Sequence, residues 1–278
     1  MPNFRLLIQV YSFFVSGYNT GIPIFERVCA MILLMTSSPC DDNVPAGVQL
    51  PCIFFRKNAF VDNLRAHWKP DSRLVVICSD PYNFPLNDEM CDTFTKCFRY
   101  HGMSISSSIM LDSRNERDAA SILALSDAVM LGGGHVPTQH EFFERIGLRN
   151  LMREYTGVIM GVSAGSMNCK DIVYAQPELP GESVDPGYRR FIPGLGLSRV
   201  QVLPHYQMVK DNMLDGRRLY EDITFSDSFG RSFYVLVDGS YVMRENDTYT
   251  LWGEGYRICD GQMTQICRDG EHITIGED

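Results

Sequence analysis

The sequence lacks any concentrated block of positive charge. Of its 278 residues, 25 are Lys or Arg and 34 are Asp or Glu, which gives a net charge of -9, and no run of basic residues is longer than a pair. Nucleic acids and anionic membranes bind proteins through clustered positive charge. We therefore expect neither as a partner, and expect a small-molecule or peptide substrate.

Patterns typical of disulfide frameworks and zinc sites are also missing. The nine cysteines are odd in number and scattered, and no two of them form a CxxC pair. Most fall in apolar runs, which is typical of buried free thiols in a reducing compartment. We expect a cytoplasmic protein that needs no metal and no organic cofactor.

No apolar run reaches the roughly 18 residues that cross a membrane. Residues 6–15 form a shorter apolar run, but polar residues dilute it and no cleavage site follows closely, so a signal peptide is disfavoured. Met31 begins an apolar run, residues 31–35, that predicts a first core strand. We expect residues 1–30 to be an N-terminal extension of uncertain status and residues 31–278 to form a single catalytic domain.

From Met31 onward, short apolar runs alternate with helical periodicity. This alternation predicts an α/β fold in three layers, with a mostly parallel, doubly wound sheet. Strands are expected at residues 31–35, 74–78, 104–110, 128–131, 158–161 and 199–203. Helices are expected at residues 60–68, between the N-cap Asn87 and Gly102, at 115–125, from the capping box Thr138 to Glu141, and at 211–225.

After residue 225, apolar and polar residues alternate with a period of two, as in β-strands. Three Asp-Gly pairs separate strand-like segments there, and such pairs favour tight turns. They are Asp238-Gly239, Asp260-Gly261 and Asp269-Gly270. The pattern predicts antiparallel hairpins that complete the domain.

One short motif suggests a nucleophile. Residues Gly161 to Gly165 match G-x-S-x-G, in which Ser163 would sit on a tight turn between a strand and a helix. The apolar run 158–160 supplies the strand, and the residues after Ala164 can begin the helix. The sequence therefore predicts that Ser163 is a catalytic serine.

A serine hydroxyl needs a base to accept its proton, and six histidines are available. Catalytic groups in parallel sheets gather beyond the carboxyl ends of the strands. His205 follows the expected strand 199–203 after a single proline, just as Ser163 follows its own strand. This placement selects His205 as the base.

The third member of such a triad is an acid that orients the histidine. Three acidic residues, Glu178, Glu182 and Asp185, lie between Ser163 and His205. Spacing alone leaves the choice among them open.

An acyl-transfer site also needs donors for the oxyanion. The amide of Ala164 is one candidate, and the glycine turn at residues 132–134 can supply another, with Gly133 and Gly134 as the expected donors. His135 and His140 flank this turn.

Several stretches together resemble the peptidase E and cyanophycinase family of serine peptidases, which are relatives of the class I glutamine amidotransferases. The matching stretches are Leu131-Gly-Gly-Gly-His135, Gly161-Val-Ser-Ala-Gly165, Gln176-Pro-Glu-Leu-Pro180 and Gly194-Leu-Gly-Leu-Ser-Arg-Val-Gln-Val-Leu-Pro-His-Tyr206. The similarity covers most of residues 31–278.

The resemblance implies a class I glutamine amidotransferase-like fold and a Ser163, His205 and Glu178 triad, because the family's acid lies some fifteen residues after its serine. It also implies that substrate contacts fall on His135 and Gln139, behind the glycines, and on Arg189. Amino-terminal aspartyl dipeptides are the family substrate that would need such a cation. The assembly is expected to be a monomer or a homodimer.

Two other readings stay open. An esterase of the α/β-hydrolase type shares G-x-S-x-G, and its base would be His272 near the end of the chain. A non-catalytic protein with the same fold could instead bind a peptide or an amino acid.

Overall fold

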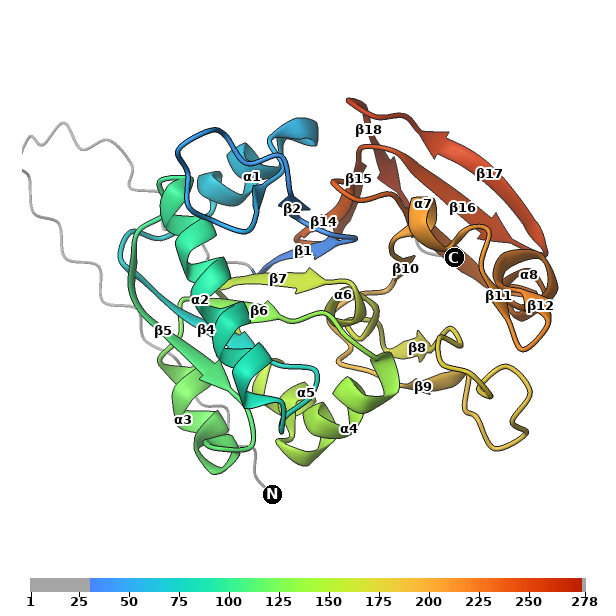
Figure 1. Ribbon diagram of the computed structural model, residues 1–278, viewed down its shortest axis with the longest axis horizontal. Coiled ribbons are helices and arrows are strands. Elements are labelled where there is room, and N and C mark those ends of the chain that lie inside the picture. Colours follow the sequence, from blue (N-terminus) through green and yellow to red (C-terminus); the bar gives the residue numbers. More distant parts are fainter. Residues whose placement is uncertain (1–30, 277–278) are drawn as a thin grey trace, which may run out of the picture.

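The computed structural model describes residues 31–276 and has a mixed sheet of eight strands at its centre (Figure 1). Five strands are mutually parallel, in the order β1, β7, β6, β4 and β5, and three antiparallel strands, β14, β15 and β18, extend the sheet beyond β1. Their bounds are β1 Ile32–Thr36, β7 Val158–Val162, β6 Ala128–Leu131, β4 Ser72–Ile77, β5 Ile105–Leu111, β14 Tyr241–Glu245, β15 Thr248–Trp252 and β18 His272–Ile275. This arrangement confirms the predicted α/β class with antiparallel strands at the C-terminus.

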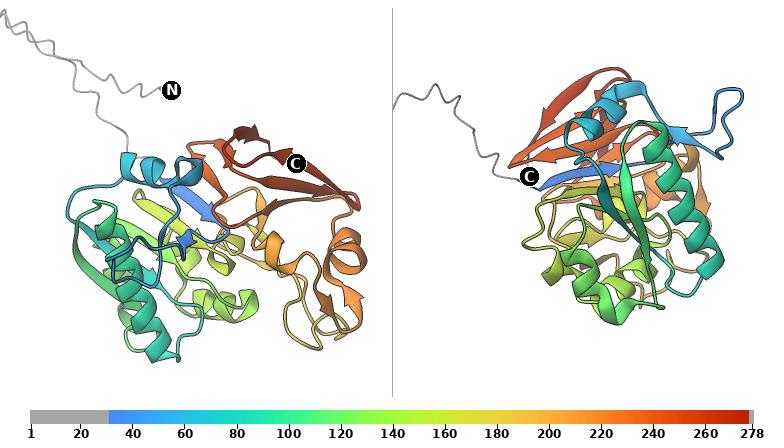
Figure 2. Two further views of the ribbon diagram at one scale, coloured as in Figure 1. Left: turned by 45° about the horizontal axis from the view of Figure 1, so that its top comes forward. Right: turned by 90° about the vertical axis from the view of Figure 1, so that its left-hand side faces the viewer.

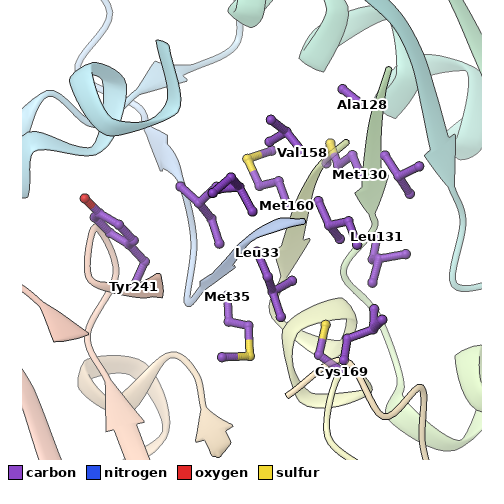
Figure 3. Close-up of a cluster of buried hydrophobic side chains, with 14 of the residues drawn as sticks. Leu33, Met35, Ala128, Met130, Leu131, Val158, Met160, Cys169 and Tyr241 are labelled. Carbon is purple, nitrogen blue, oxygen red and sulfur yellow. The ribbon is translucent and has the colours of Figure 1, made fainter. Parts of the chain in front are cut away.

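The central strands form because they are apolar on both faces. All residues of β1 and β6 are buried, as expected for parallel strands covered on both sides. Figure 3 shows Leu33, Met35, Met130 and Met160 from three adjacent strands within this core. The connecting helices are η1 Lys57–Ala59, α1 Phe60–Ala66, α2 Phe84–Tyr100, η2 Glu116–Asp118, α3 Ala119–Ala124, α4 Val136–Arg145, α5 Leu148–Leu151 and α6 Ala164–Met167.

A second sheet of four strands has its own apolar core. Its order is β10 (Gln201–Leu203), β13 (Ser232–Leu236), β16 (Gly255–Cys259) and β17 (Gln262–Cys267), with β10 and β13 parallel and the other pairs antiparallel. Figure 2 shows these C-terminal strands, in orange and red, on the side of the molecule opposite the green helices α3 to α5. The chain passes from β13 into β14, so one short turn joins the two sheets.

Smaller elements complete the described chain. Three two-stranded ladders pair β2 (Cys40–Asp41) with β3 (Ile53–Phe54), β8 (Ile172–Tyr174) with β9 (Phe191–Pro193), and β11 (Met213–Leu214) with β12 (Arg217–Arg218). The remaining helices are α7 Tyr206–Val209, η3 Leu219–Thr224 and α8 Phe225–Asp227.

All six expected strands are present, but three local predictions were wrong. The segment predicted as a helix at 211–225 begins as the β11–β12 hairpin, because Asp215 and Gly216 both adopt positive φ, at 51° and 78°, as a tight hairpin turn requires. Helix α2 begins at Phe84, so Asn87 is an internal residue of the helix, and its side-chain Nδ2 donates to the carbonyl oxygen of Asp80. Helix α4 begins before Thr138, whose hydroxyl bonds the His135 ring instead of capping the helix.

No helix within residues 31–276 is long and apolar enough to cross a membrane. The N-terminal extension expected at residues 1–30 lies outside the described residues.

Candidate active site

Three strand ends bring a serine, a histidine and an aspartate together. Ser163 follows β7 directly, His205 lies two residues after β10, and Asp238 lies two residues after β13. In Figure 1, β7 points toward α6, β10 and α7, where the two sheets meet. Nε2 of His205 is 2.9 Å from Oγ of Ser163, and Nδ1 is 2.8 Å from Oδ1 of Asp238. The structure thus brings together the serine and histidine singled out from the sequence.

The backbone at Ser163 and His205 is held in an unusual conformation. Their φ angles are 51° and 59°, in the left-handed region that residues with a β-carbon rarely adopt. The amide of Ser163 donates to the carbonyl oxygens of Thr36 and Ser37, both at 3.1 Å, and the amide of His205 donates to Oγ of Ser37 at 2.7 Å. The end of β1 therefore fixes both residues.

The glycines of the G-x-S-x-G motif are required by close packing. A β-carbon on Gly165 would lie 2.3 Å from the carbonyl oxygen of Leu131, and one on Gly161 would lie 2.8 Å from the amide nitrogen of Ser166. Both neighbours are backbone atoms, which cannot move aside. The motif thus reflects the tight strand-to-helix turn that exposes Ser163.

The carboxylate of Asp238 accepts three hydrogen bonds from side chains. Besides the His205 bond, Ser37 Oγ donates to Oδ1 at 2.6 Å and Gln207 Nε2 donates to Oδ2 at 2.6 Å. Burial alone would raise the pKa of Asp238, but the hydrogen bonds from His205 and Ser37 outweigh burial and lower it. Asp238 is therefore ionised at neutral pH and can stabilise a positive imidazolium.

The expectation that Glu178 orients His205 was wrong, because Asp238 occupies Nδ1 of His205. The backbone amide of Glu178 donates to Oε2 of Glu182 at 2.8 Å, and its carboxylate has no hydrogen bond to a residue within 31–276. Burial raises the pKa of Glu178, while His135 and His205 act against this rise through their charge. Glu178 thus lies near the histidines without joining the triad.

Asp238 was not considered as the acid from the sequence, although a signal was present. Asp238-Gly239 was assigned only to a hairpin turn, whereas it joins β13 of one sheet to β14 of the other. Because β13 pairs in parallel with β10, with Leu203 opposite Val235, both strands end at the same edge. Once this pairing is known, Asp238 is placed beside His205 by the same strand-end rule, but the sequence pattern does not reveal which strand pairs with β10.

The expected oxyanion donors lie beside the serine. A β-carbon on Gly133 would lie 3.5 Å from Cβ of Ser163. Among the described residues, the amides of Gly133, Gly134 and Ala164 have no backbone or side-chain acceptor, whereas the amide of Gly132 is bound to the carbonyl of Ile77. Gly134 has a φ of 148°, and a β-carbon there would lie 2.1 Å from Oγ of Ser79. These amides are free to bind a substrate oxygen.

Two of the residues expected to contact substrate, His135 and Gln139, lie in different surroundings. His135 follows the glycine turn, with Nε2 2.8 Å from Oε1 of Glu182 and Nδ1 2.8 Å from Oγ1 of Thr138. Gln139 is 0% exposed, and its side-chain Nε2 donates to the carbonyl oxygen of Gly132 at 2.7 Å. The assignment of Gln139 to substrate is therefore corrected: it supports the glycine turn from within the core.

The other candidate residues lie elsewhere. Arg189 is exposed and has no ion pair within residues 31–276, so its contact with substrate stays a prediction. His272, the base of the esterase alternative, is on β18 and stacks on Trp252 with ring centres 4.2 Å apart. Within the described part of the chain, no group of three or more potential ligand side chains could hold a metal ion.

The model of peptidase family S51 matches residues 81–252, which include Ser163, His205 and Asp238. The chain belongs to peptidase family S51. It is thus a serine-type peptidase, as the resemblance to peptidase E implied. No curated protein sequence matches the chain significantly.

A solved structure shows the same fold as this S51 peptidase. It is a protein of Listeria monocytogenes EGD-e that is provisionally described as peptidase E. The two sequences are 13% identical, the match covers 85% of this chain and 99% of the other, and the TM-score is 0.51.

Proposed function

We propose that this peptidase hydrolyses short peptides through an acyl-enzyme on Ser163. The hydrogen-bonded chain from Ser163 Oγ through His205 to Asp238 is the observation that carries the proposal. Each group has the partner that its role requires: the hydroxyl has a base, and the base has an ionised acid at its other nitrogen.

The proposed reaction has two halves. Nε2 of His205 takes the proton of Ser163 as Oγ attacks the peptide carbonyl carbon, and the resulting oxyanion is bound by the amides of Gly133, Gly134 and Ala164. His205 then donates this proton to the leaving amine, and the C–N bond breaks. Water, activated by His205, attacks the ester in the second half and releases Ser163.

The finer substrate class rests on the resemblance to peptidase E. We propose dipeptides, with amino-terminal aspartyl dipeptides as the first candidates and Arg189 as the cation for their side chain. The carboxylate of Glu178, without a partner among the described residues, is suited to bind the ammonium group of such a substrate. The scattered thiols support the proposal that the protein acts in a reducing compartment, the cytoplasm.

The test is hydrolysis of a dipeptide panel by the purified chain. The panel varies the first residue among Asp, Glu, neutral and basic types, and includes N-acetylated and β-aspartyl members. We expect turnover that disappears in Ser163→Ala and His205→Ala and persists in His272→Ala. The exposed Ser121→Ala is the matched serine control.

Full turnover by pure Ser163→Ala protein would contradict the proposal. Binding of panel members without any turnover by the wild-type chain would favour the alternative of a peptide-binding protein.

A further inference from the structure

Three cysteine side chains meet beside the β2–β3 ladder. Sγ of Cys40 and Sγ of Cys52 are 3.0 Å apart, and Sγ of Cys97, on α2, donates to the Cys52 carbonyl oxygen at 3.1 Å. Cys40 is half-buried, Cys52 is 7% exposed and Cys97 is 0% exposed. Two thiols therefore touch near the surface, and the third lies beneath them.

This cysteine cluster has no part in the proposed catalysis, but it is connected to residues that support the triad. Cys40 begins β2, three residues after Ser37, and its amide donates to Oγ of Ser38 at 3.2 Å. The carbonyl oxygen of Ser38 accepts from the amide of Gly239, next to Asp238, at 3.0 Å. The Cys40 end of the ladder thus contacts the turn that carries the triad acid.

Metal binding does not account for the cluster. In the part of the chain that the structure describes, no set of three or more Cys, His, Asp or Glu side chains converges well enough to hold an ion. Two adjacent thiols can, however, be joined by oxidation when their sulfurs are already in contact.

We propose that Cys40 and Cys52 form a peroxide-sensitive dithiol. Oxidation by a peroxide joins the two sulfurs in a disulfide, which closes the exposed loop between β2 and β3. The reaction has two steps. The Cys52 thiolate attacks hydrogen peroxide, the O–O bond breaks, and a sulfenic acid forms with release of one water after protonation. The Cys40 thiol then attacks the Cys52 sulfur, and the hydroxyl leaves with the thiol proton as a second water. In sum, two thiols are oxidised and one peroxide is reduced to two waters.

The surroundings favour Cys52 as the attacking sulfur. Hydrogen bonds from the Cys40 and Cys97 thiols lower the pKa of Cys52, so it holds the negative charge within the cluster. A thiolate is the nucleophilic form of cysteine. The other two thiols have raised pKa values, through their hydrogen bonds to Cys52 and through burial.

Cys40 is the expected partner because its surroundings can adjust. It sits on a two-residue strand that opens the mostly exposed segment 42–51. Cys97 lies inside a helix of 17 residues, where its sulfur is fully covered by the core. A small approach of Cys40 to Cys52 therefore disturbs less of the structure than a movement of Cys97.

The test is mass spectrometry of the full chain, carried in a Cys29→Ser background, after treatment with hydrogen peroxide and alkylation. Cleavage before Asp41 and Asp42 with an Asp-specific protease, and then with trypsin, separates residues 28–40 from residues 42–56. We expect the two peptides to remain joined, with a loss of two hydrogens, until dithiothreitol is added.

Matched variants identify the partner. Cys40→Ser should abolish the cross-link, Cys97→Ser should retain it, and the half-buried Cys91 should stay fully alkylated as the control outside the cluster. Circular dichroism of each variant confirms folding. A Cys52–Cys97 cross-link in the Cys29→Ser chain would overturn the proposal. So would a Cys29→Ser chain in which Cys40 and Cys52 both remain free or oxidise only to sulfinic acid.

Discussion

Replacing Asp238 by asparagine tests the acid of the triad, because asparagine keeps the size of the side chain and removes its charge. The carboxylate accepts from Nδ1 of His205 and Oγ of Ser37 on one oxygen and from Nε2 of Gln207 on the other. An amide cannot satisfy all three donors. If its oxygen faces His205, its NH2 group meets the NH2 group of Gln207.

In the reverse orientation the amide nitrogen faces Nδ1 of His205. The ring must then carry its proton on Nε2, where it can no longer accept the proton of Ser163. The loss of an acid in this position lowers kcat by about 10⁴ in a comparable triad. At about 1.4 kcal/mol for each factor of ten, this corresponds to about 5 kcal/mol of transition-state stabilisation. We expect the same order of loss in Asp238→Asn.

The assay is kcat and KM on the dipeptide that the wild-type chain hydrolyses fastest, with thermal unfolding to confirm that the variant folds. Glu178→Gln is the matched control: it also replaces a carboxylate near His205 by an amide, and we expect its kcat within about tenfold of wild type while its KM rises. If Asp238→Asn kept most of its kcat and Glu178→Gln lost it, Asp238 would not be the acid of the triad.

Three further predictions concern the support of the site. Ser37→Ala removes the hydrogen bond from the Ser37 hydroxyl to the charged carboxylate of Asp238, worth about 1.5–3 kcal/mol, so kcat should fall roughly 10- to 100-fold. The control Ser240→Ala should leave kcat unchanged, because the buried hydroxyl of Ser240 has no hydrogen-bond partner within residues 31–276. The pKa of Asp238 is lower in the folded state than in the unfolded chain, where it is about 4, so the ionised carboxylate stabilises the fold above about pH 4. This contribution is lost as the pH falls through the lower pKa of the folded state. In urea unfolding, the difference in unfolding free energy between wild type and Asp238→Asn should therefore shrink below about pH 4. Gly165→Ala should cost about 1–3 kcal/mol of stability, whereas Gly276→Ala, which has open space, should cost nothing measurable by the same method.

The strands of the core could be predicted from the sequence because burial on both faces leaves a continuous apolar run. The run 128–131 coincides with β6 at both ends. Ser163 and His205 could be predicted for a related reason: each lies just beyond the end of such a run, so the edge of the sheet places them without knowledge of any loop.

The acid could not be chosen in this way, because its place depends on how two sheets meet. Asp238 reaches His205 only because β13 pairs with β10, and β13 comes after a segment that was predicted to be helical. Spacing left Glu178, Glu182 and Asp185 open, and the resemblance to peptidase E then selected Glu178, at the family's usual distance after the serine. Gln139 was assigned to substrate from the resemblance alone, whereas its side chain is buried and its Nε2 donates to the carbonyl oxygen of Gly132.

The central claim is that Ser163 is the nucleophile, and covalent labelling tests it most directly. The purified chain is treated with a fluorophosphonate, and the modified residue is located by peptide mass spectrometry. We expect one adduct on Ser163, none in Ser163→Ala and much slower labelling in His205→Ala. An adduct on another residue, or equal labelling of Ser163→Ala, would contradict it.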